Sequence, residues 1–90
     1  MVITEEILDE ILTYLEKSVN NLAIEAFENL ELEGGYTGVE NFLQNQFEVR
    51  LENLLAGKNS SIHHLESGMK NKVIQRKQKI FDEITRQYKN

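Results

Sequence analysis

No proline occurs among the 90 residues, and three of the five glycines lie between positions 34 and 38. Proline breaks a helix because its ring clashes with the preceding turn and it lacks a backbone N–H. Long stretches can therefore remain helical, and apolar residues recur along them at spacings of three and four, the period of one helix face. We predict an all-α protein, a small three-helix bundle with two long helices. A break at Gly68, or at Asn20 and Asn21, would make four helices.

The first helix is predicted over residues 4–33. Thr4 is a candidate N-cap because its side-chain oxygen can accept a hydrogen bond from a free N–H of the first turn. Glu5 and Glu6 follow directly, where the helix dipole favours negative charge. Gly34 is expected to end the helix in a left-handed conformation.

Two more helices are predicted, over residues 38–56 and 61–88. Thr37 and Glu40 have the spacing of a capping box, which would start the second helix at residue 38. Gly57 is expected to end it. Ninety residues are enough for a single modest core and too few for two, so we expect residues 1–90 to form a single helical domain.

A second set of apolar residues lies outside these stripes. Phe42 and Val49 are seven residues apart, on the side of the second helix away from its main stripe. Ile7 and Tyr14 have the same spacing on the first helix. A monomer could not cover all four side chains, so we predict that they bind a partner. The simplest partner is a second copy of the chain, and we predict a homodimer that completes the bundle.

Charge is distributed unevenly along the chain. Residues 1–33 carry nine acidic side chains and one basic one, whereas residues 58–90 carry eight basic and three acidic ones. An acidic first helix and a basic third helix attract each other, within one molecule or between two. We expect this attraction to strengthen a contact between helices.

Four basic residues of the third helix fall on one arc beside its apolar face: Lys72, Arg76, Lys79 and Arg86. Such a row is typical of helices that follow nucleic-acid phosphates, so these residues are a possible nucleic-acid-binding site. The isoelectric point near 5.0 and Glu83 within the same row argue against it. The acidic first helix offers a further alternative, an inhibitor that imitates a phosphate backbone in the groove of a nucleic-acid enzyme.

Composition excludes several other classes of protein. The chain has no cysteine, hence no disulfides and no thiolate metal sites. His63 and His64 with Glu66 supply too few ligands for zinc. The glutamate pairs Glu6–Glu10 and Glu48–Glu52 have no nucleophile beside them, so we expect no metal, cofactor or catalytic residue. The longest apolar run is far shorter than the roughly 20 residues of a membrane span. We therefore expect a soluble, unprocessed cytoplasmic protein, with a regulatory or protein-binding role and no enzymatic activity.

Overall fold

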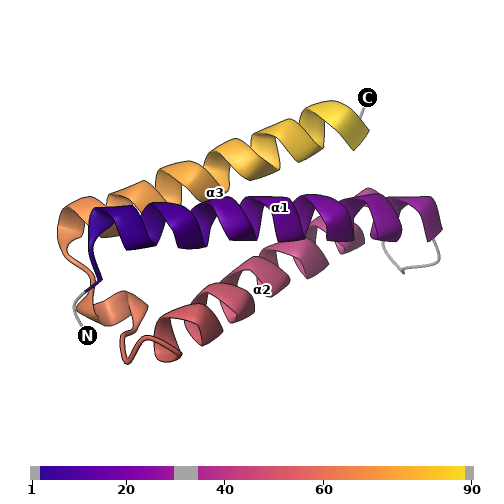
Figure 1. Ribbon diagram of the computed structural model, residues 1–90. Helices are drawn as coiled ribbons and strands as arrows, with labels where there is room; N and C mark the ends of the chain where they lie inside the picture. The colour runs from indigo at the N-terminus through magenta and orange to yellow at the C-terminus, as the bar shows by residue number, and fades with distance from the viewer. Residues whose placement is uncertain (1–2, 30–34, 89–90) are drawn as a thin grey trace.

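The computed structural model describes residues 3–29 and 35–88, and in this part of the chain it is an all-α bundle (Figure 1). The elements are α1 (Glu5–Asn29), α2 (Gly35–Ala56), the 3-10 helix η1 (Ile62–His64) and α3 (Ser67–Tyr88). In Figure 1, α1 runs between α3 above it and α2 below it. Its contacts with both neighbours are more extensive than those between α2 and α3. The predicted all-α bundle is confirmed.

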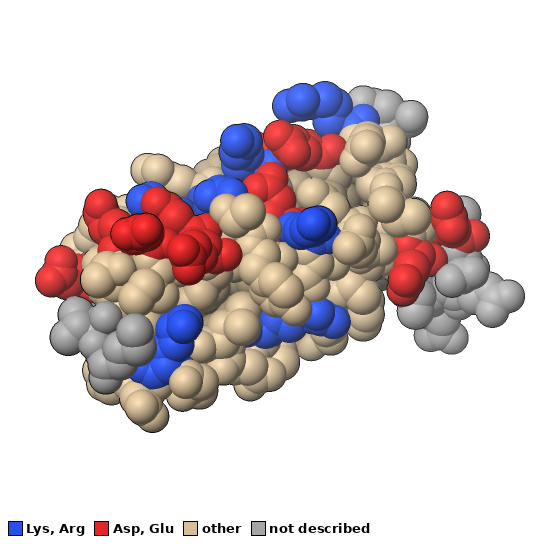
Figure 2. Space-filling model, viewed as in Figure 1, with Lys and Arg blue, Asp and Glu red and all other residues tan. Residues whose placement is uncertain are grey.

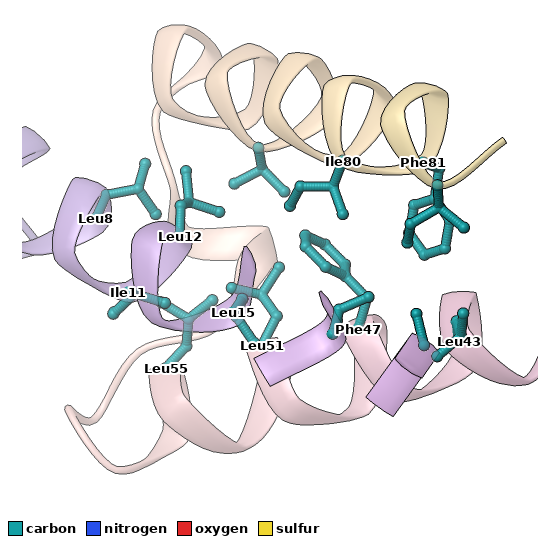
Figure 3. Close-up of a cluster of buried hydrophobic side chains, with 14 of the residues drawn as sticks. Leu8, Ile11, Leu12, Leu15, Leu43, Phe47, Leu51, Leu55, Ile80 and Phe81 are labelled. Carbon is teal, nitrogen blue, oxygen red and sulfur yellow. The ribbon is translucent and has the colours of Figure 1, made fainter. Parts of the chain in front are cut away.

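The predicted apolar stripes meet in one core (Figure 3). Its centre is built from fully or almost fully buried side chains of all three helices: Leu8, Ile11, Leu12, Leu15, Val19, Ala23, Val39, Leu43, Phe47, Leu51, Leu55, Val73, Ile80 and Ile84. Phe81 and Ile3 are buried as well. Removing these side chains from water is the main force that holds the bundle together.

The start of α1 agrees with the sequence. The N–H of Ile7 donates a hydrogen bond to the Thr4 hydroxyl at 3.2 Å, which is the predicted N-cap. The helix continues through Asn20 and Asn21 without a break. It is described as far as Asn29, so the predicted end near Gly34 lies outside the described residues.

α2 begins three residues earlier than predicted. Its first residue is Gly35, with φ of +58°, a conformation that glycine adopts without steric penalty. Thr37 is therefore already inside the helix, and the predicted capping box is wrong. Glu40 instead accepts a hydrogen bond from the Tyr36 hydroxyl at 2.9 Å. The first turn of α2 is thus tied by side chains four residues apart.

Asn59, not Gly57, is the left-handed residue after α2. Its φ is +58°, and the N–H of Ser60 donates to the carbonyl of Leu55 at 2.9 Å. The N–H of Asn59 also donates to the carbonyl of Ala56. These two bonds form a Schellman motif, which satisfies carbonyls at the helix end. Asparagine tolerates this conformation better than other residues with a β-carbon.

The third predicted helix is divided, although not at Gly68. Leu65, with ψ of 143°, is extended between η1 and α3, and its side chain is buried in the core. α3 then begins at Ser67, so the expected start at residue 61 is wrong by six positions. Gly68 lies in the first turn of α3, and a β-carbon there would meet nothing within 4 Å. The glycine therefore marks no close helix crossing, and the residues before α3 form a short 3-10 turn in place of a fourth α-helix.

Candidate interaction surfaces

Two of the four basic residues predicted on the third helix form ion pairs with α1. Lys72 Nζ lies 2.9 Å from a carboxylate oxygen of Asp9, and Arg76 Nη2 lies 3.0 Å from Glu16 Oε1. Arg76 also donates to the Thr13 hydroxyl at 3.1 Å. In Figure 2, acidic side chains gather over the first half of α1, with basic side chains of α3 beside them. The attraction expected between these two segments therefore acts inside one chain.

The ion pair with Asp9 changes the acidity of Lys72. A hydrogen bond to the Asp9 carboxylate favours the charged ammonium and raises the pKa of Lys72 above its ordinary value of 10.5. Because the folded-state pKa is raised, the contribution of Lys72 to stability is present below pH 10.5 and is lost as the pH rises further. About one-third of the Lys72 side chain and nearly half of the Asp9 side chain are accessible to water, which screens the pair, so the contribution is small.

The other two predicted basic residues, Lys79 and Arg86, are exposed. Neither forms an ion pair within residues 3–29 and 35–88. They remain available to an external anion, but the row of four predicted from the sequence is divided, since half of its charge is already paired with α1.

Further polar contacts fix α2 against its neighbours. Arg50 Nη1 donates to the Ser18 hydroxyl of α1 at 2.8 Å. Lys77 Nζ of α3 donates to Glu48 Oε1 of α2 at 2.6 Å and lies 5.8 Å from the centre of the Phe47 ring. Lys77 therefore joins α2 to α3 above the central aromatic residue of the core.

The four apolar residues predicted to bind a partner do not all have the same surroundings. Tyr14, Phe42 and Val49 are exposed, at 57%, 39% and 45% of their full accessible area. Ile7 is half-buried and packs against the core, so the chain itself covers part of it. Phe42 and Val49 on α2 are therefore not fully covered by the rest of the described residues. The helix that packs between two neighbours is α1.

The most exposed large apolar side chain of the described residues is Ile74, at 61%, which the sequence analysis did not single out. It lines a groove of about 540 Å³ between α2 and α3. Val73 and Phe81 of α3 and Ile62 of η1 contribute apolar surface, and α1 contributes no lining residue. The groove follows from the packing order, because α2 and α3 both lie against α1 and make fewer contacts with each other. An isoleucine outside the main stripe of α3 was the signal available in the sequence.

An aromatic cluster lies where α1 ends, α2 begins and α3 ends. The ring of Phe27 stacks on Tyr88 at 4.3 Å and on Tyr36 at 5.5 Å between ring centres. The Tyr36 and Thr85 hydroxyls share a hydrogen bond of 2.8 Å. Partial burial raises the pKa of Tyr36 above its ordinary value of 10.0, and the carboxylate of Glu40 acts in the same direction. This cluster ties the end of α1 and the start of α2 to the last turn of α3.

The candidate metal ligands do not converge. Across residues 3–29 and 35–88, no three side chains of histidine, cysteine, aspartate or glutamate lie close enough together to hold a metal ion. His63 and His64 are exposed in η1. In the same ranges, no helix has the length and apolar character needed to cross a membrane.

Comparison of the chain with protein-family models, curated proteins and solved structures finds no match.

Proposed function

We propose that the protein is a small, non-enzymatic interaction or regulatory module that acts through helix–helix contacts. The observation that carries this proposal is the groove between α2 and α3, with Ile74 exposed at its edge. Amphipathic helices commonly bind in such apolar grooves, through anchors spaced three, four and seven residues apart. A helix seated between α2 and α3 would complete a four-helix arrangement.

The charge distribution also supports protein binding over nucleic-acid binding. A helix that follows phosphates needs several unpaired basic residues along one side. Lys72 and Arg76 are engaged by carboxylates of α1, which leaves Lys79 and Arg86 from the predicted row. Two exposed cations on a chain of net charge −5 are a weak attraction for a polyanion. Nucleic-acid binding is therefore the second candidate.

The experiment is capture from a lysate of the native host on immobilised full-length chain, with and without nuclease treatment. Ile74→Gln removes the exposed anchor at the groove without changing the charge. Ile24→Gln is the matched control, because Ile24 is 46% exposed on α1 and does not line the groove. We expect the wild-type chain and Ile24→Gln to retain the same protein after nuclease treatment, and Ile74→Gln to lose it.

A different pattern would contradict the proposal. Retention that disappears on nuclease treatment and is unaffected by Ile74→Gln would indicate nucleic-acid binding. In that case Lys79→Gln and Arg86→Gln should each lower the slope of the logarithmic salt dependence by about 1.

A further inference from the structure

Four residues of α3 form a continuous row along the groove. Lys70, Ile74, Gln78 and Asp82 follow one another at spacings of four, and all four line the groove. Residues four apart make one of the ridges by which α-helices pack against each other. The row therefore presents, in order, a positive charge, an apolar side chain, a polar side chain and a negative charge. At 1.5 Å per residue the two charges are roughly 18 Å apart along the helix.

The charges at the two ends of this row have no ion-pair partner among residues 3–29 and 35–88. The ion pairs of residues 3–29 and 35–88 join other side chains, and neither Lys70 nor Asp82 takes part in one. By contrast, Lys77 lies between them and is paired with Glu48 across the groove. The row thus has an unpaired positive charge at one end, an unpaired negative charge at the other, and the exposed Ile74 between them.

This order of charges is complementary to itself when one copy is reversed. In an antiparallel arrangement of two identical rows, Lys70 faces Asp82 of the second copy, and its own Asp82 faces the second copy's Lys70. Ile74 faces Gln78 of the second copy and lies against the apolar wall of its groove. A parallel arrangement would instead place Lys70 against Lys70, which is repulsive. The exposed side chain and the groove that receives it lie on the same surface, as a two-fold symmetric contact requires.

We propose that the ligand of the groove is a second copy of this chain, held by antiparallel contact between the two α3 helices. This inference rests on the proposed function and names its partner. It also assigns the homodimer predicted from the sequence to the Ile74 surface, and not to Ile7, Tyr14, Phe42 and Val49.

The test uses charge reversal in the full-length chain, with the dimer dissociation constant measured by sedimentation equilibrium at low salt. Lys70→Glu places two acidic pairs across the contact, and Asp82→Lys places two basic pairs there. Each single change should weaken the dimer about tenfold, and the double variant should recover most of this loss. An equimolar mixture of the two single variants should form a heterodimer in preference to either homodimer, because every charge pair across the contact is then attractive. Native mass spectrometry distinguishes the three species.

Two further variants separate the apolar contact from the charges. Ile74→Gln should weaken the dimer at least tenfold, since each dimer contains the change twice. Ile24→Gln should leave the dissociation constant unchanged. Circular dichroism of each variant confirms that it is folded.

Several outcomes would overturn the inference. A wild-type chain that is monomeric at all accessible concentrations has no second copy in its groove. A dimer insensitive to Ile74→Gln uses another surface, and a mixture that forms no preferred heterodimer excludes the antiparallel arrangement. If a monomeric chain still captures another protein through Ile74, this inference fails while the proposed function stands.

Discussion

Replacing Phe47 with alanine tests the core where α2 and α3 come together. The side chain is fully buried, and its ring lies edge-on to that of Phe81, with 6.4 Å between ring centres and an angle of 74°. Lys77 Nζ lies 5.8 Å from the centre of the Phe47 ring. The truncation removes apolar area from the core and leaves a cavity, and such changes cost about 3 to 5 kcal/mol. Loss of the edge-to-face contact is part of that cost.

This loss is large relative to the stability of so small a protein. At roughly 0.05 to 0.15 kcal/mol per residue, the whole chain is stable by about 5 to 13 kcal/mol. With a urea dependence of about 1.5 kcal/mol per molar for a small protein, the unfolding midpoint should fall by about 2 to 3 M. Circular dichroism is the suitable probe, because the chain is helical and has no tryptophan.

Phe42 provides a matched control on the same helix. It is 39% exposed, whereas Phe47 is fully buried, so the same change in chemistry occurs in two environments. Phe42→Ala should cost about 1 kcal/mol or less. Each titration is repeated at two protein concentrations, because association would raise the apparent stability with concentration. Equal losses for Phe42→Ala and Phe47→Ala would refute the assignment of the core face on α2.

Three other changes have defined outcomes. Gly68→Ala should raise the free energy of unfolding by about 0.5 to 1 kcal/mol, because the new methyl group meets no atom within 4 Å and alanine favours the helix; a lower urea midpoint would contradict this. A double-mutant cycle of Arg76→Gln and Glu16→Gln should give a coupling energy of about 1 kcal/mol or less, smaller in high salt, since both side chains are about one-quarter exposed. The raised pKa of Tyr36 means that the folded state keeps a proton which the unfolded chain loses near pH 10.0, so stability falls as the pH rises through that range. Tyr36→Phe should reduce the loss of unfolding free energy between about pH 9 and 11, measured by urea titration. If the loss is unchanged, other groups cause it.

The sequence by itself determined the class of structure and most of the core. Apolar residues spaced for one helix face, in a chain without proline, leave few alternatives to packed helices. Most residues of the predicted stripes of α1 and α2 are buried, with Leu22, Ala26 and Leu54 partly buried, and Thr4 caps α1 as expected. These features depend on interactions within about one helical turn, which a local pattern can reveal.

The ends of helices were harder to predict because several local signals compete. Gly35 starts α2 although Thr37 and Glu40 fit a capping box. Asn59 takes the left-handed position although Gly57 was available two residues earlier. In both cases the sequence offered more than one acceptable end, so the local signals did not specify a single boundary.

Only the tertiary structure decided which residues from distant segments meet. Local helix geometry already separates Val73 from Ile74 by about 100° on α3, but only the packing of α2 and α3 against α1 places the exposed Ile74 beside a groove. The sequence allowed Arg76 to contact either a phosphate or a carboxylate, and the alignment of α3 with α1 placed it against Glu16. Such pairings depend on the register and crossing of whole helices, and no pattern confined to one helix encodes them.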